Sequence, residues 1–580
     1  MTRWIGTPAI AAVAALGLAA CSAPSNNAGT PTGNASSTTE QAQEKAADPA
    51  AKGPAKEIAG SRKGGTMTVY ATTVPSTFDP TNIYYVDGNQ IAKLTFRTLT
   101  QFDIRDGKPV LVPDLAADLG TVSSDKLTWT FKLKTGIKYM DGTAVKAEDF
   151  AYAIKRSFAH DVFDAGPTYQ LTYFKDADTY KGPYKGGDTY AGVETPDDST
   201  LVIHLKTPFP DLPFYGTFPM FTPIPKAKDT KDNYDKAPMT TGPYMWTSYN
   251  PGVELKLAKN PNWDPATDPV RHQYVDNWDF KWGGDTVKLQ QQVLASQGPD
   301  AASINYDALD ATLVPEATGA KKDQFLNGDS PCTYVFQMDT RKVPMEVRKA
   351  IAAAYPYDEW RKVAGLATLT GPPASTILPP AVPGYTKYEL PNLTGTGKGD
   401  PAAAKKILEA AGKVGFEISW YYSNDNQIAT NVSQVRQKAF EAAGLKVKAI
   451  GVASTQIRKF INGYEKVNTN QGPRGWCSDW PSGSSWFPVL FKSRSVDDLN
   501  SIGEIQDPAL DAEIDAVSNL PFDQQAAAWG ALDKKIMEKY LPALPLYYDR
   551  TALVFGSKAG GIVNDPTQGL PIFTQVFVKQ

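Results

Sequence analysis

The sequence predicts an α/β protein of two lobes with mixed β-sheets, behind a disordered N-terminal tether. Three observations indicate this fold. The chain has 580 residues, which is more than one hydrophobic core usually organises. Its first half contains short stretches that alternate polar and apolar residues, as half-buried strands do. A later stretch near residue 400 alternates helix and strand patterns, which is typical of a parallel sheet.

The first residues carry the features of an export signal. One cation, Arg3, precedes an apolar run from Ala9 to Ala20, which is too short to remain as a membrane-spanning helix. Leu18-Ala19-Ala20-Cys21 matches a bacterial lipoprotein signal, in which residues 1–20 are removed and a diacylglycerol is attached to Cys21. An ordinary secretory peptide with an incidental cysteine is the alternative. We therefore expect a protein on the extracytoplasmic face of the cell membrane, anchored through lipid on Cys21.

Residues 21–62 are predicted to form a flexible tether. This segment consists mainly of Ala, Ser, Thr, Gly, Asn, Pro, Gln and Glu, with one Ile and no aromatic residue. Such a composition buries too little apolar surface to offset the entropy that ordering costs. No later stretch is apolar enough to cross a bilayer.

Alternating patterns predict the first strands, at residues 65–70, 128–133 and 200–205, with the last two in one sheet. His204 lies at an alternate position of its strand, which favours a partly covered strand residue over a metal ligand. Residues 147–158 have a helical pattern with Asp149, Lys155 and Arg156 on the solvent face. The many Pro, Phe and Tyr residues between 209 and 243 indicate irregular but packed structure.

The clearest unit begins at Asp400, which is suited to cap a helix that has Pro401 at its first position. An apolar stripe through Ala404, Leu408 and their neighbours extends this helix to Gly412. A strand at 416–422, a helix at 428–443 and a strand at 445–452 then form a predicted βαβ unit, which implies parallel strands. A further helix is expected at 347–354.

The composition excludes several classes of function. Lys and Arg total 59 and Asp and Glu 62, for a net charge of −3, so no basic excess attracts nucleic acid. Three His and three Cys are too few for the usual metal cages, and no phosphate-binding loop or hydrolase motif is present. We therefore expect no cofactor, no metal and no catalytic residue. A surface lipoprotein hydrolase with an unrecognised pair of carboxylates remains an alternative.

Two cysteines follow the export signal, Cys332 and Cys477. In an oxidising exported compartment they are expected to form a disulfide. Two separate buried thiols are the alternative.

An aromatic segment at residues 473–487 suggests a binding site. It has the sequence PRGWCSDWPSGSSWF, in which three Trp residues and Phe487 surround one acid, Asp479. A carboxylate held among aromatic walls would select an ammonium group. The alternative is structural, with Ser478 or Asp479 capping a helix and the Trp residues in the core.

The chain resembles the oligopeptide/dipeptide-binding family of solute-binding proteins that serve bacterial ATP-driven (ABC) importers. The resemblance covers residues 64–579. The matching stretches are STFDP at 76–80, LTWTFKL at 127–133, GIKYMDGT at 136–143, AEDF at 147–150, TGPY at 241–244, KNPNW at 259–263, VRKAI at 347–351, DP at 400–401 with AG at 411–412, and LPLY at 544–547.

This resemblance implies a periplasmic-binding-protein-like fold of class II, with three domains in two lobes that enclose a ligand. Lobe I would comprise residues 63–98, 232–330 and 546–580, with a second domain at 99–231 packed on it. Lobe II would comprise residues 331–545. The resemblance also implies a monomer without catalytic activity, whose partners are a peptide ligand and the permease and ATPase subunits of the importer.

The same resemblance assigns roles to particular residues. Trp476-Cys477-x-Asp479 is similar to the segment whose Asp pairs with the peptide α-ammonium and whose Cys is bridged to the position of Cys332. Gly475, Cys477 and the stretch Tyr84-Tyr85-Val86 would offer backbone groups to an extended peptide, and Trp480 would stand beside them. Arg474 would meet a peptide carboxylate or lie on the surface.

Two departures from the family pattern leave the cargo open. Pro481-Ser482-Gly483-Ser484 follows the binding-site acid, where relatives have a second acid or an Asn-rich run. Tyr355-Pro356-Tyr357-Asp358 replaces the usual Asp-Arg pair. A nickel chelate, an opine or an oligosaccharide is therefore an alternative to a peptide.

Overall fold

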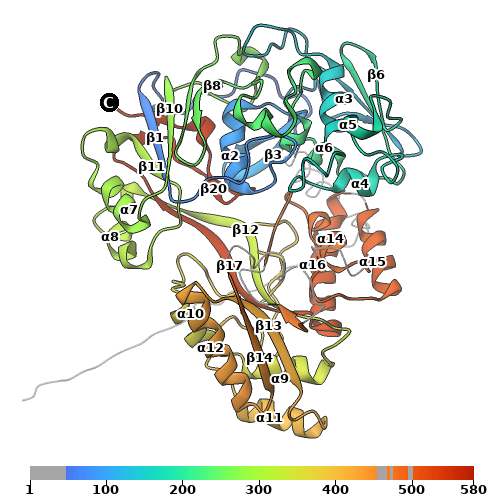
Figure 1. Ribbon diagram of the computed structural model, residues 1–580, viewed down its shortest axis with the longest axis vertical. Coiled ribbons are helices and arrows are strands. Elements are labelled where there is room, and N and C mark those ends of the chain that lie inside the picture. The colour runs from blue at the N-terminus through green and yellow to red at the C-terminus, as the bar shows by residue number, and fades with distance from the viewer. Residues whose placement is uncertain (1–46, 454–466, 471–474, 494–500, 521) are drawn as a thin grey trace, which may run out of the picture.

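The computed structural model describes residues 47–453, 467–470, 475–493, 501–520 and 522–580. Figure 1 shows two lobes, called upper and lower here, joined by two long strands, β12 (Phe325–Met338) and β17 (Ala543–Val554). These strands pair antiparallel over most of their length, with irregular register between Asp329 and Thr333. The predicted two-lobed α/β fold is confirmed. The predicted boundaries at 330 and 545 fall within the two connecting strands.

The first sheet of the upper lobe is mixed, with the strand order β11-β1-β10-β9-β8. β1 pairs parallel with β10 and β11, whereas β9 pairs antiparallel with β10 and β8. Met67 of β1 and Trp278 of β10 are buried in the core beneath this sheet, together with Leu94 of a covering helix. The elements are β1 (Thr66–Ala71), α2 (Val86–Thr95), β8 (Tyr244–Asn250), β9 (Glu254–Lys259), β10 (Asn277–Trp282) and β11 (Ser303–Asn305).

The second domain of the upper lobe contains a four-stranded antiparallel sheet of order β4-β5-β7-β6. β5 pairs with β7 along its whole length, which confirms that these two predicted strands share one sheet. Helix α3 packs Phe150 and Ile154 into the same core, and its acidic first turn and basic last turn suit the helix dipole. The elements are β2 (Thr100–Arg105), β3 (Lys108–Pro113), β4 (Thr121–Val122), β5 (Thr128–Lys132), α3 (Ala147–Arg156), β6 (Val193–Asp197) and β7 (Thr200–His204).

The lower lobe contains the predicted βαβ unit, and its two strands pair parallel in register. Asp400 caps α11 as expected, because its carboxylate accepts a hydrogen bond from the Ala403 N–H at 2.8 Å. Trp420 of β13 and Phe440 of α12 pack together in the lobe core with Phe336 of β12. The elements are α9 (Met345–Ala354), α10 (Tyr357–Val363), α11 (Pro401–Ala410), β13 (Glu417–Ser423), α12 (Gln427–Ala442) and β14 (Lys446–Val452).

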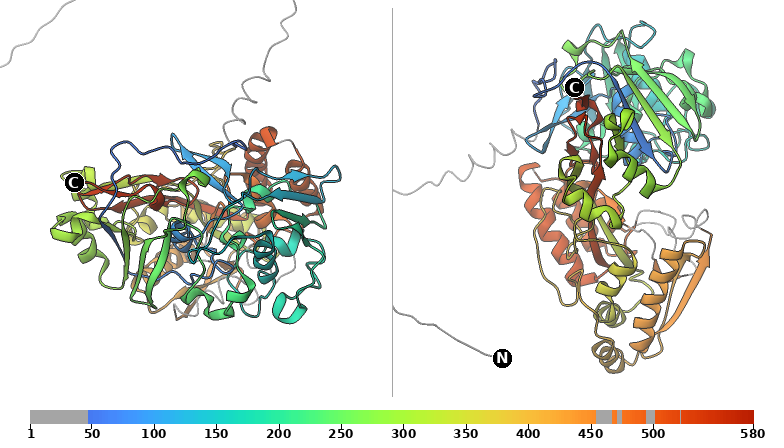
Figure 2. Two further views of the ribbon diagram at one scale, coloured as in Figure 1. Left: turned by 90° about the horizontal axis from the view of Figure 1, so that it is seen from above. Right: turned by 90° about the vertical axis from the view of Figure 1, so that its left-hand side faces the viewer.

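Three further helices form the other side of the lower lobe. Figure 2 shows them in red, opposite the orange βαβ unit. They are α14 (Phe487–Phe491), α15 (Pro508–Ser518) and α16 (Phe522–Tyr540). Two short strands, β15 (Thr469–Asn470) and β16 (Gly475–Cys477), pair with β12 beside them. Among the described residues, no helix has both the length and the apolar character that a membrane crossing requires.

The described chain has several further elements, most of them short, besides other 3-10 helices. The α-helices and strands not yet given, with one 3-10 helix, are α4 (Tyr169–Tyr173), α5 (Pro183–Gly186), α6 (Leu212–Tyr215), α7 (Thr286–Ala295), α8 (Val314–Thr318), the 3-10 helix η9 (Gly483–Ser485), β18 (Ala559–Gly560), β19 (Asn564–Asp565), β20 (Leu570–Pro571) and β21 (Phe577–Val578).

Residues 47–62 differ from the prediction, because they lie along the upper lobe and not in a flexible tether. The Asp48 N–H donates to the Leu111 carbonyl at 2.8 Å. Tyr274 donates to the Glu57 carboxylate at 2.8 Å and accepts from the Ile58 N–H. These hydrogen bonds join a polar segment to residues that are distant in the sequence. The composition of the segment therefore could not predict them. The other predicted tether residues, 21–46, lie outside the described chain.

A buried guanidinium joins the two domains of the upper lobe. Arg156 of α3 donates two hydrogen bonds to Asp79, at 2.6 and 2.7 Å, and one to Asp229 at 3.1 Å. Asp79 lies in the connection from β1 to α2, the same connection that carries Tyr84 and Tyr85. A bidentate pair has little orientational freedom. Arg156 therefore fixes the position of this connection against α3.

We expect the substitution Arg156→Ala to destabilise the upper lobe by about 3–5 kcal/mol, because it leaves two buried carboxylates without their cation. Calorimetric unfolding would show this as a lower thermal midpoint. Lys185→Ala is the matched control, since it removes a cation whose pair with Asp161 is exposed, and it should leave the midpoint unchanged. Equal midpoints for the two variants would contradict the prediction.

Candidate ligand-binding site

Asp479 lies where the two lobes meet. It follows β16 of the lower lobe, and its carboxylate accepts hydrogen bonds from two phenols of the upper lobe. One is Tyr84, at 3.0 Å, in the residues that precede α2. The other is Tyr169, the first residue of α4. The acid that the sequence singled out therefore faces the opposite lobe.

The surroundings of Asp479 disfavour its negative charge. Burial raises the pKa of the Asp479 carboxyl to about 7, although the hydrogen bonds from Tyr169 and Tyr84 act in the opposite direction. Burial and the neighbouring carboxylate also raise the pKa of both phenols well above the usual value for Tyr, so both stay neutral donors. Within the described chain, Asp479 has no ion pair with a Lys, Arg or His.

Trp480 connects the lobes next to this acid. Its side chain is 1% exposed and belongs to the apolar core of the upper lobe's second domain, although its backbone belongs to the lower lobe. The indole packs against Tyr169 at a centroid distance of 4.9 Å, and its Nε1–H donates to Asp211 at 3.1 Å. The two lobes are therefore in contact on this side of Asp479.

The other two tryptophans of the segment pack within the lower lobe. Trp476 donates from Nε1 to the Ser485 carbonyl at 2.9 Å and packs against the lobe core. Trp486 is fully buried and donates to the Ser478 hydroxyl. The sequence predicted indole walls around Asp479, whereas its direct partners are phenols from the other lobe. Of the structural alternative, the cap at Ser478 or Asp479 is wrong, since the hydroxyl of Ser482 caps η9. Its other part is confirmed for Trp480 and Trp486, which are core residues.

The predicted disulfide between Cys332 and Cys477 is confirmed. It joins two residues that lie opposite each other on the antiparallel strands β12 and β16. It therefore ties the segment that carries Asp479 to a strand that connects the two lobes.

The outer edge of β16 presents main-chain groups for pairing. The Ser478 N–H donates to the Pro331 carbonyl at 2.9 Å, and antiparallel pairing alternates between bonded and non-bonded residue pairs. Trp476 therefore bonds to β12, whereas the main-chain groups of Gly475 and Cys477 point away from it. Among the described strands, none pairs with this edge. A Cβ at Gly475 would lie 2.4 Å from the Thr333 carbonyl oxygen, so glycine is required there.

The remaining predicted residues have different positions. Tyr85 is 45% exposed and precedes α2, which begins at Val86, and the Tyr85 carbonyl accepts from the Asn89 N–H at 3.0 Å. Tyr84 reaches the site through its side chain, whereas the sequence analysis expected its backbone. Arg474 and Cys21 lie outside the described residues.

Sequence reasoning missed two residues that meet the aromatic segment, Tyr169 and Asp211. Both lie in the second domain, and 310 positions separate Tyr169 from Asp479. No local pattern connects them to the segment. Among the described residues, no three His, Cys, Asp or Glu side chains lie close enough together to hold a metal ion.

Comparison with known proteins identifies the family to which this chain is similar. A sequence model described as "Bacterial extracellular solute-binding proteins, family 5 Middle" matches residues 110–498. The periplasmic oligopeptide-binding protein OppA of Salmonella typhimurium is 23% identical over 532 residues, which cover 86% of this chain and 90% of that protein. The glutathione-binding protein GsiB of Escherichia coli is 25% identical, over 75% of this chain and 82% of its own length.

A solved structure shares the fold. The clavulanic acid biosynthesis oligopeptide binding protein 2 superposes with a TM-score of 0.81 at 25% identity. The match covers 92% of this chain and 99% of that one. The arrangement of two lobes around a seam is therefore common to both chains.

The substitution Asp479→Asn should stabilise the ligand-free protein at pH 8. The pKa of Asp479 is about 7 in the folded chain and about 3.9 in an unfolded one. The protonated Asp479 carboxyl therefore contributes its full stabilisation of the folded state below about pH 4, and this stabilisation is lost as the pH rises through 7. Asn still accepts from both phenols but carries no charge.

We expect the free energy of unfolding of this variant to rise by about 1–2 kcal/mol at pH 8 and not to change at pH 4. Calorimetry would show the gain as a higher thermal midpoint at pH 8. Asp178→Asn is the control, because its exposed carboxylate pairs with Lys206 and its loss should bring no gain. A variant that is less stable at pH 8 would show that Asp479 has a cationic partner.

Proposed function

The chain belongs to the bacterial extracellular solute-binding proteins of family 5, and from this we propose that it is the extracytoplasmic receptor of an ABC importer and that its cargo is an oligopeptide. Asp479 carries the proposal. It is a partly buried carboxylate at the seam between the lobes, held by two neutral phenols and without a cation in the described chain. The α-ammonium of a peptide would supply that cation.

Such a ligand would act on both lobes at once. Tyr84 and Tyr169 approach Asp479 from the upper lobe, and β16 approaches from the lower lobe. A ligand that contacts both sides stabilises the closed arrangement over the open one. In the open form the carboxylate would regain water. Closure around an ammonium replaces that water by a charge of opposite sign.

The main chain of β16 supports a peptide in preference to another ammonium compound. Gly475 and Cys477 direct their main-chain groups outward along an edge that no described strand occupies. An extended peptide could add there as a further strand, with about 1 kcal/mol net for each hydrogen bond. Main-chain pairing tolerates many side chains, as expected of a receptor for peptides of varied sequence. OppA and the clavulanic acid protein carry oligopeptide binding in their names.

The remaining parts of the proposal come from the sequence. Cys21 would carry the lipid that anchors the receptor to the membrane, and the residues after it would keep the protein near its permease at raised local concentration. A nickel chelate, an opine or an oligosaccharide is the alternative cargo, and none of the contacts of Asp479 favours one of them over a peptide.

Calorimetric titration tests the cargo. We expect tri- to pentapeptides with a free N-terminus to bind, and the same peptides with an acetylated N-terminus to bind far more weakly. Asp479→Asn should lose about 2–5 kcal/mol of binding free energy, because it removes one partner of a charge pair. Glu194→Gln, which removes an exposed acid of the second domain, should leave the affinity unchanged. Equal binding by free and acetylated peptides would refute the peptide assignment.

The affinity should also depend on pH. Protonation of Asp479 competes with the ammonium, so the affinity should fall as the pH drops below about 7, by up to tenfold for each pH unit. Above about pH 8 the peptide amine loses its proton and the affinity falls again. Titrations between pH 5.5 and 9 should give a maximum near pH 7–8 for free peptides and a flat profile for Asp479→Asn. A flat wild-type profile would contradict this.

A further inference from the structure

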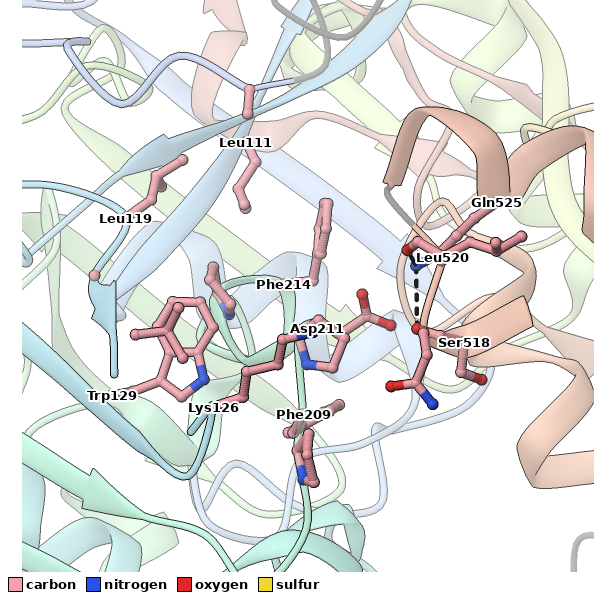
Figure 3. Close-up of a pocket in the computed structure, with 17 residues that line it drawn as sticks. Leu111, Leu119, Lys126, Trp129, Phe209, Asp211, Phe214, Ser518, Leu520 and Gln525 are labelled. Carbon is pink, nitrogen blue, oxygen red and sulfur yellow. Dashed lines mark hydrogen bonds between the residues drawn. The ribbon is translucent and has the colours of Figure 1, made fainter. Parts of the chain in front are cut away.

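A pocket of about 570 Å³ lies between the lobes, and its lining includes Asp211, which accepts a hydrogen bond from Trp480. Figure 3 shows its two walls. One wall comes from the second domain of the upper lobe and includes Leu111, Trp129, Phe209 and Phe214. The other comes from the end of α15, the first turn of α16 and the connection between them, and it includes Leu520 and Gln525. Neither Asp479 nor its two phenols line this pocket, so it is separate from the proposed peptide site.

One charged group stands in this apolar surrounding. Asp211 is 5% exposed, and Figure 3 shows its carboxylate directed toward the wall formed by Ser518 and Leu520. Oδ2 accepts from the Trp480 Nε1–H at 3.1 Å, and the carboxylate also has a hydrogen bond with the Ser484 side chain. No described Lys, Arg or His forms an ion pair with it. Lys126, which also lines the pocket, is exposed to solvent.

An unpaired carboxylate in an apolar pocket determines which ligands fit. Burial raises the pKa of Asp211 to about 6, so the group still carries its charge at pH 7. Both hydrogen bonds come from neutral groups. A cation next to the carboxylate would therefore offset the cost of burying that charge, whereas an anion would be repelled. The aromatic and aliphatic walls favour an apolar body. The volume lies within the range of small-molecule sites.

We propose that this pocket is a second binding site, for a small organic cation with one ammonium group on Asp211 and an aromatic or aliphatic body between the two walls. This site goes beyond the proposed peptide receptor and does not depend on the nature of the main cargo. Because both lobes line the pocket, its ligand favours the closed arrangement. The Trp480 side chain bonds to Asp211 while its backbone adjoins Asp479, so occupancy of either site should raise the affinity of the other.

Tryptamine is a suitable probe, because it joins an ammonium to an indole, and tryptophol is its neutral analogue of similar shape. Calorimetric titration of the full chain should show tryptamine binding and at least about tenfold weaker binding of tryptophol. Asp211→Asn should weaken tryptamine binding by about thirtyfold or more. Asn keeps an oxygen acceptor for the Trp480 Nε1–H, so this variant changes the charge with little effect on the contact between the lobes.

Two further variants separate the sites. Val122→Trp fills the pocket from its 42% exposed strand position on β4 and should also abolish tryptamine binding, which covers the case that Asp211→Asn disturbs the fold. Asp479→Asn should not weaken tryptamine binding, since it belongs to the other site and its loss of charge does not oppose closure. Tryptamine binding that survives both pocket variants, or that Asp479→Asn abolishes, would overturn the proposal. So would the absence of heat at millimolar tryptamine, or equal binding of tryptophol.

The peptide titrations and the tryptamine titrations test the two proposals independently. If peptides fail to bind while tryptamine binds in the manner described, the proposed cargo is wrong and the second site stands. If peptides bind and tryptamine does not, the second site is wrong and the proposed function stands.

Discussion

The insertion of Trp480 into the upper lobe is the contact on which both proposed sites depend. Its backbone belongs to the lower lobe, yet its indole is part of the apolar core of the second domain. Trp480 directly follows Asp479, which accepts from Tyr84 and Tyr169, and its indole donates to Asp211 at the pocket. Burial of an indole contributes about 2–4 kcal/mol to this contact between the lobes.

The buried charges discussed above fall into two groups, those with a partner of opposite charge in the protein and those without one in the described chain. Arg156 meets Asp79 and Asp229 directly, so that network is satisfied within the protein and fixes the connection that carries Tyr84. Asp479 and Asp211 are also withdrawn from water but have no cation in the described chain, and the pKa of each is raised. Unpaired burial lowers stability. Its presence at two points of one seam is the basis of both proposals, in which a ligand supplies the cation.

The backbone of the lower lobe supports this electrostatic arrangement. The disulfide joins Cys477 to the connecting strand β12, and the lack of a side chain at Gly475 lets β16 approach that strand closely. Asp479 therefore follows a segment that cannot shift independently of the strands between the lobes. The same constraint orients the outer main-chain groups of β16, and it leaves them available because no described strand covers that edge. Charge recognition and main-chain pairing thus share one short segment.

The sequence by itself determined the features that depend on near neighbours. Alternation and capping located the βαβ unit from Asp400 to Val452, and export chemistry predicted the pairing of Cys332 with Cys477. Asp479 was found because its aromatic neighbours stand beside it in the chain. Only the tertiary structure decided that phenols from the other lobe hold this acid, that Trp480 leaves its own lobe, and that Asp211 faces a pocket. Residues 47–62 likewise follow the upper lobe through a few long-range contacts. The physical reason is that helix and strand periods and caps act over a few residues, whereas the two crossings between lobes bring together side chains hundreds of positions apart.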